Sequence, residues 1–222
     1  MPKLRTLFFA LSSSVILSLA ATVARADTIN IVGVNSGQVS TATVVCEFNS
    51  QTNTFTFTIT NTSSITSPGS TSTITGIGFD LPPTGNASAS GLNGFSGMQA
   101  PSLSSTFNFS DGDLGNVPAG LNNVVLDFGF TTGPSGSFSG GSVNDGLLPG
   151  ESASFTVTGA AFTGFTQAQI CNAIFVRFQN TPVVGSDVGV PGGAIPEPST
   201  MFLLGTGLLG AAGVLRRKMR SR

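Results

Sequence analysis

Two aspartates separated by one glycine come closest, in type and spacing, to a chemical site. Asp111 and Asp113, in the run DGDLGN that begins at Asp111, could offer hard oxygen ligands to Ca²⁺. An EF-hand loop would need a longer ligand set that ends in glutamate, and the residues that follow do not supply it. Because Asp and Gly together also mark turns, we favour an ordinary Asp-Gly turn and no metal.

The chain lacks the residues that most catalytic sites require. It contains no His, Tyr or Trp, so neither a Ser-His-Asp nor a Cys-His site can be assembled from it. A pair of carboxylates could hydrolyse glycosides, but their separation cannot be read from a sequence. We therefore expect a non-catalytic protein without a cofactor. Two alternatives stay open, a membrane-tethered enzyme acting on polysaccharide and a calcium-dependent carbohydrate-binding module.

Charge is distributed unevenly along the chain. Apart from Arg177, every Lys and Arg lies before residue 26 or after residue 215. The segment between the two ends holds nine acidic residues against that one base, a net charge of −8. Nucleic-acid binding depends on clustered Lys and Arg, so this composition excludes a nucleic-acid partner.

Residues 1–26 have the three parts of a secretory signal peptide. Lys3 and Arg5 form a basic start, an apolar run follows, and Ala24 and Ala26 form a small-x-small exit. We expect cleavage directly before Asp27. The alternative is a helix that stays in the membrane as an anchor.

The C-terminal segment, residues 195–222, has three consecutive parts. A Pro-Glu-Pro tripeptide comes first, then an uncharged apolar stretch from Met201 to Leu215, then a basic cluster. Prolines keep the preceding backbone extended, and the basic residues predict a cytoplasmic end for a transmembrane helix. The apolar stretch is short and rich in glycine, which weakens it as a permanent anchor.

This segment resembles the PEP-CTERM sorting domain of Gram-negative bacteria. The resemblance covers about 28 residues and implies recognition by an exosortase, an integral membrane cysteine transpeptidase. It further implies removal of the tail and transfer of the body from the inner membrane to the cell surface or an exopolysaccharide matrix, as in a biofilm. An ordinary stop-transfer anchor is the alternative. The motif residues are Pro196, Glu197, Pro198, Ser199 and Thr200, and the basic flank is Arg216, Arg217 and Lys218.

Between the two ends the hydrophobic pattern has a period of two. Phe55, Phe57 and Ile59 alternate with threonines, which is typical of a half-buried strand. Similar runs recur and are separated by turn-forming residues. The pattern predicts an all-β body over residues 27–180, a single β-sandwich of about seven to nine strands. Segments such as FTFTITNTS and LPGESASFTVTG resemble immunoglobulin-like surface modules, so we expect an immunoglobulin-like or jelly-roll-like sandwich. One short helix is expected near 166–173.

The segments around the body are expected to be irregular. Residues 85–105 and 131–142 are rich in Gly and Ser and are predicted to be long loops. Residues 181–194 contain two prolines and paired glycines, and are predicted to form a stalk that separates the body from the membrane.

Cys46 and Cys171 are the two cysteines of the chain. An exported chain enters an oxidising compartment, so we expect a disulfide between them. Two buried free thiols are the main alternative. A reactive cysteine is disfavoured, because no histidine is available to lower its pKa.

Overall fold

A computed structural model of the chain describes the body between the two targeting segments. The residues described are 26–64, 71–82, 92–102, 105–112, 114, 124–133, 137–139, 141–182 and 184–194. The predicted signal-peptide helix, apart from Ala26, and the predicted C-terminal transmembrane helix lie outside these residues. Within the described part of the chain, no helix has the length and apolar character needed to cross a membrane.

Ten strands form one antiparallel sheet, in the spatial order β5-β8-β3-β2-β1-β10-β9-β4-β7-β6. Their bounds are β1 Asp27–Gly33, β2 Gly37–Asn49, β3 Thr54–Asn61, β4 Thr73–Phe79, β5 Phe95–Gln99, β6 Asn108–Asp111, β7 Phe128–Thr131, β8 Ser152–Gly159, β9 Ile174–Thr181 and β10 Gly185–Ala194. The helical elements of the described residues are short: η2 Val143–Asp145, η3 Ala160–Phe162 and α2 Gln167–Asn172.

The long strands form where apolar and polar side chains strictly alternate along the sequence. In β3 every second residue is buried, and Phe55, Phe57 and Ile59 are at most 2% exposed. The threonines between them point to the other face of the sheet, because successive side chains alternate across a strand. The same rule buries Phe155 and Val157 in β8, which pairs with β3.

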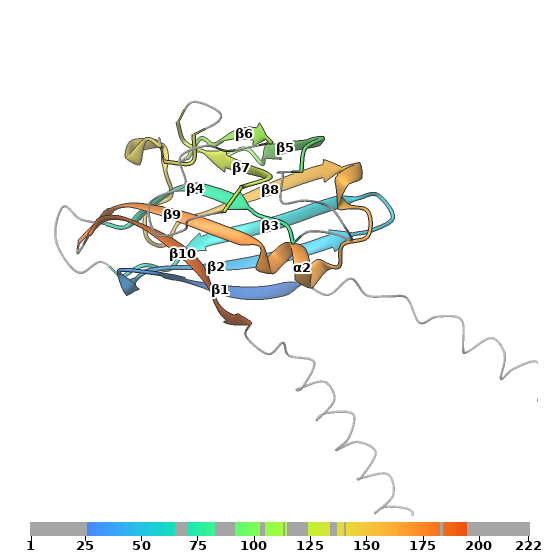
Figure 1. Ribbon diagram of the computed structural model, residues 1–222. Coiled ribbons are helices and arrows are strands. Elements are labelled where there is room, and N and C mark those ends of the chain that lie inside the picture. The colour runs from blue at the N-terminus through green and yellow to red at the C-terminus, as the bar shows by residue number, and fades with distance from the viewer. Residues whose placement is uncertain are drawn as a thin grey trace, which may run out of the picture.

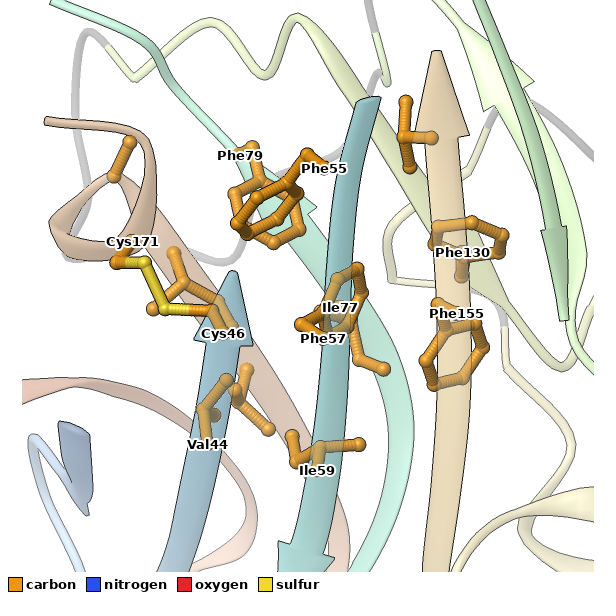
Figure 2. Packing of buried hydrophobic residues seen from close by; sticks show 14 of the residues in the cluster. Val44, Cys46, Phe55, Phe57, Ile59, Ile77, Phe79, Phe130, Phe155 and Cys171 are labelled. Carbon is orange, nitrogen blue, oxygen red and sulfur yellow. A yellow bond between two sulfur atoms is a disulfide. The ribbon is translucent and has the colours of Figure 1, made fainter. Parts of the chain in front are cut away.

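The interior is a cluster of phenylalanines. Phe57 stacks on Phe155 with ring centroids 4.9 Å apart, and Phe79 stacks on Phe128 at 4.7 Å. Phe57 on β3 also meets Phe79 on β4, with ring centroids 5.3 Å apart, and because β3 and β4 are far apart in the strand order, the sheet must fold over on itself to bring them together (Figure 2). Phe162, on η3, adds edge contacts to this cluster.

The sheet is nearly closed, because its two edge strands lie side by side (Figure 1). Side chains join them instead of a backbone ladder. The carboxylate of Asp111 on β6 accepts the backbone N–H groups of Gly94 and Phe95, each at 3.0 Å. At the other end of β5, Oε1 of Gln99 accepts the N–H of Phe107 at 2.7 Å. These side-chain contacts cover part of the two sheet edges, which limits edge-to-edge aggregation.

The all-β class and the short helix are confirmed, and three details of the prediction are wrong. The described residues form ten strands, not seven to nine, and all ten belong to one continuous sheet. Residues 85–105 contain β5. The predicted stalk at 181–194 is mostly β10, which lies between β1 and β9 in the middle of the sheet.

Glycines explain why β10 packs as a strand without an apolar alternation. A Cβ at Gly189 would lie 2.5 Å from Cγ2 of Ile31 and 2.8 Å from Cε2 of Phe178. Glycine therefore allows the backbone of β10 to approach large side chains of its neighbours closely. Val188 is 4% exposed and provides a conventional core contact on the same strand.

Candidate functional site

The two ends of the body meet at one end of the fold. β1 starts at Asp27, and β10 runs antiparallel beside it, with Ile29 opposite Ala194. The residue that follows the predicted signal-peptide cleavage point and the residue that precedes the sorting segment therefore lie close together. The start of β1 and the end of β10 therefore lie at the same end of the body (Figure 1).

A disulfide holds this same end of the body together. Cys46 lies opposite Asp27 in the ladder between β1 and β2, and it is bonded to Cys171 on α2, with Cα atoms 6.4 Å apart (Figure 2). The predicted disulfide is thus confirmed. Thr166 caps α2 through a reciprocal capping box with Gln169, which fixes where the helix begins.

A pocket of about 510 Å³ lies beside α2 at this end. Its described lining contains one ionisable residue, Asp80, which directly follows β4. Burial raises the pKa of the Asp80 carboxyl above its ordinary value of 3.8. The rest of the lining is apolar or amide: Leu81, Pro82, Ala168, Gln169, Asn172 and Ala173.

Asp127 is a second carboxylate near this pocket, and its role is to hold loops. It is 3% exposed, and its two oxygens accept the backbone N–H groups of Leu81, at 2.7 Å, and of Leu92. Burial raises the pKa of Asp127 to about 6, although these two hydrogen bonds act in the opposite direction. The charge of neighbouring Asp80 raises that pKa further.

Asp187 forms a similar tie at the start of β10. Its carboxylate accepts the N–H and the hydroxyl of Ser36, at 2.7 and 2.6 Å, and the N–H and amide group of Asn35. Burial alone would raise its pKa. The hydrogen bonds from Ser36, Asn35 and Val188 outweigh burial, so the pKa of Asp187 is lowered. This aspartate anchors the turn between β1 and β2.

The calcium candidate does not come together as a site among the described residues. Both oxygens of Asp111 are used by the backbone of Gly94 and Phe95, and Asp113 lies outside the described residues. Within the described part of the chain, no group of three or more His, Cys, Asp or Glu side chains is placed to hold a metal ion.

Arg177 is the one basic residue of the body and is buried, with 7% exposure. Its Nε has no hydrogen-bond partner, and burial lowers the pKa of the guanidinium. Once the Gln179 amide is turned to satisfy its neighbours, its oxygen accepts from Arg177 at 3.3 Å. No ion pair is formed by this arginine in the described part of the chain.

The sequence did not lead us to predict that buried aspartates hold loops through hydrogen bonds, although it contains a weak signal for buried acids. Asp80 and Asp127 each stand between two large apolar residues at a strand end, as Phe79-Asp80-Leu81 and Leu126-Asp127-Phe128. An acidic residue between two large apolar residues is buried unless the adjacent loop leaves its carboxyl group exposed to solvent. A buried carboxylate requires hydrogen-bond donors.

The residues of the predicted sorting site all lie outside the described residues: Pro196, Glu197, Pro198, Ser199, Thr200, Arg216, Arg217 and Lys218. Of the predicted signal-cleavage residues, Ala26 is described as exposed coil, and Ala24 is outside. What the structure does place is Ala194, at the end of β10 and two residues before Pro196.

Comparison with known families gives one match, and it falls on this C-terminal segment. Residues 194–218 match the family of the PEP-CTERM protein-sorting motif. No curated protein and no solved structure matches the chain. The match contains the Pro-Glu-Pro tripeptide, the apolar stretch and the first basic residues, which are the three parts recognised in the sequence. The chain therefore carries a PEP-CTERM protein-sorting motif, which begins at the last residue of β10 in a disulfide-bonded all-β body.

Proposed function

We propose that this protein is a non-catalytic component of the cell surface or of an exopolysaccharide matrix, such as a biofilm. In this proposal the body, two packed layers of one folded sheet, is exported, held at the inner membrane by its tail, and released by an exosortase. The observation that carries the proposal is the sorting motif at 194–218, which begins at the last residue of β10.

The uses of the carboxylates support the non-catalytic part of the proposal. Asp111, Asp127 and Asp187 each accept backbone N–H groups of a neighbouring loop. Glu151 does the same for Leu148 at 2.8 Å. An acid that is committed to holding its own loop is poorly placed to exchange protons with a substrate, since catalysis needs it within reach of the reacting atoms.

A polysaccharide-acting enzyme is the competing candidate, and the pocket beside α2 is where it would work. Asp80 lines that pocket, and it lies close enough to Asp127 for its charge to raise the pKa of Asp127. Hydrolysis of a glycoside normally needs two carboxyl groups that both reach the sugar. Both oxygens of Asp127 are occupied by Leu81 and Leu92, which favours the structural role.

The proposal is tested by changing the motif and following the protein in its native host. The variant replaces Pro196, Glu197 and Pro198 with alanine, and the matched control replaces Pro149, in a turn of the body, with alanine. We expect the wild type and the control in the surface or matrix fraction, and the motif variant at full length in the inner membrane. Equal processing and release of the motif variant would overturn the proposal.

A further inference from the structure

One face of the sheet presents an array of hydroxyl groups. It is formed by four rows of outward residues, each of which crosses four of the five adjacent strands β1, β2, β3, β8 and β5, and we refer to it as the hydroxyl face. Eleven of its sixteen residues are Ser or Thr. The sixteen are Thr28, Asn30, Thr43, Val45, Glu47, Asn49, Thr54, Thr56, Thr58, Thr60, Ser96, Met98, Ser152, Ser154, Thr156 and Thr158.

The strand registers place these hydroxyls in regular rows. Thr58 is directly opposite Ser154, and Thr60 is directly opposite Ser152. Both pairs are hydrogen-bonded between their hydroxyl oxygens at 2.7 Å. Neighbouring rows are about 6.7 Å apart along a strand, and neighbouring strands are about 4.8 Å apart. The hydroxyls are therefore held at fixed positions before any ligand arrives, which reduces the entropy lost on binding.

Side chains of this face are open to solvent in the described structure. Ser152, Ser154 and Thr158 are exposed, and Thr56 and Thr58 are half-buried by their neighbours. A shallow depression of about 300 Å³ runs over β2, β3 and β8, and residues of the hydroxyl face line it, among them Val45 and Thr156. Val45 and Met98, the two aliphatic residues of the face, are 41% and 67% exposed.

The charge of the hydroxyl face and of the body around it favours an uncharged partner. Glu47 is the single charged residue among the sixteen. The segment between the two targeting signals carries nine acids against Arg177, so a polyanion such as a polyuronate is repelled. A neutral partner rich in hydroxyl groups has no such penalty and can exchange its hydrogen bonds with water for hydrogen bonds with the rows of Ser and Thr.

We propose that the hydroxyl face binds an uncharged polysaccharide chain, laid across strands β2, β3 and β8. The inference rests on the proposed function, since it names the polymer class that would hold the protein in the matrix. Sugar hydroxyls pair with the fixed Ser and Thr hydroxyls, and the threonine methyl groups and Val45 contact the apolar edges of the sugar rings. Each contact is weak, so affinity depends on a long polymer that meets many rows at once.

Threonine is favoured in strands for its branched shape alone, so the test must separate the hydroxyl from the shape. The variant T56V/T58V/T156V keeps β-branching and removes three hydroxyls. The companion variant T56S/T58S/T156S keeps the hydroxyls and removes the methyls. The control T52V/T106V/T163V changes three exposed threonines elsewhere on the body.

The experiment is affinity electrophoresis of the mature protein recovered from its host. The uncharged probes are hydroxyethyl cellulose and dextran, and alginate is the polyuronate probe. We expect retardation by at least one uncharged probe and none by alginate. Because three hydrogen bonds are lost, the affinity of the valine variant should fall by at least about tenfold. The affinities of the serine variant and the control should stay within about twofold of the wild type.

Two results would overturn the inference, and each is distinct from failure of the proposed function. Valine and control variants that bind as tightly as the wild type would show that the hydroxyls do not make the contact. Retardation by alginate alone, or by no probe, would exclude an uncharged polysaccharide as the partner. The proposed function fails separately, through the motif variant followed in the host, whatever the probes show.

Discussion

Ile29 and Ala194 lie opposite each other in the ladder between β1 and β10, so the start and the end of the body are neighbours in space. The disulfide between Cys46 and Cys171 lies at the same end, since Cys46 pairs with Asp27. Under the proposed function, we expect this end to face the membrane when either targeting segment is attached. Processing at the sorting motif would leave the sheet complete, because β10 ends before Pro196.

The position of β10 gives a first prediction. A chain that ends after Ala194 should unfold at the same temperature as the processed protein, because the whole sheet is retained. A chain that ends after Val184 loses a strand between β1 and β9 and should not fold cooperatively. Circular dichroism melting of both chains checks this. Equal stability of the two would mean that residues 185–194 behave as the stalk that the sequence suggests.

The strands with side-chain alternation could be predicted from the sequence, and β10 could not. Thr54 to Ile59 shows its inward and outward faces directly in its letters. In β10 the information is carried by glycines such as Gly189, which are selected by the close approach of Ile31 and Phe178. That requirement exists only once the neighbouring strands are in place. Asp127 is similar, because its burial depends on loops from distant parts of the chain.

The disulfide closes a loop with a sequence separation of 125 residues. Removing it through C46A/C171A should lower the free energy of unfolding by about 4–5 kcal/mol, because the unfolded chain regains the entropy of that loop. Urea unfolding of the oxidised wild type, the reduced wild type and the variant measures the effect. The reduced wild type is the matched control and should behave like the variant. A change below about 1 kcal/mol in both would show that the end of the body is held mainly by packing.

Asp127 predicts how stability depends on pH. Its pKa is raised from 3.8 to about 6 by burial, so between about pH 4 and pH 6 the folded protein binds more protons there than the unfolded chain. Stability from this group is complete below pH 4 and is lost as the pH rises through 6. D127N should make the melting temperature depend less on pH over this window. Because the pKa of Asp80 is also raised, the melting temperature of the variant should still fall slightly as the pH rises. The control D145N replaces an exposed aspartate and should keep the wild-type slope. A melting temperature that rises from pH 4 to 6 would contradict this account.

Asp187 acts in a lower pH range and with the opposite sign. Its pKa is lowered by hydrogen bonds that outweigh burial, so its contribution is present above about pH 4 and is lost as the pH falls further. D187A leaves the buried N–H group of Ser36 and the part-buried N–H group of Asn35 without an acceptor and should cost about 3 kcal/mol at pH 7. Denaturant unfolding at pH 7 and at pH 3 measures it. The loss should be smaller at pH 3, and an equal loss at both would assign it to packing instead of charge.

Replacing Arg177 with methionine should leave the stability of the fold unchanged or increase it. Its guanidinium is buried, and its Nε has no partner. Because a buried polar group without a hydrogen bond costs free energy, R177M should be neutral or stabilise the fold by about 1 kcal/mol. Thermal melting of R177M beside R177K checks this. A loss of more than about 2 kcal/mol for R177M would show that the arginine supports the sheet.

Intact-mass spectrometry of the mature protein, purified from the surface or matrix fraction of its native host, tests the central claim most directly. The account predicts a chain that begins at Asp27, contains the Cys46–Cys171 disulfide, and ends between Pro196 and Thr200, with any added mass identifying the acceptor of the exosortase reaction. A protein that still extends to Arg222 in that fraction would contradict it.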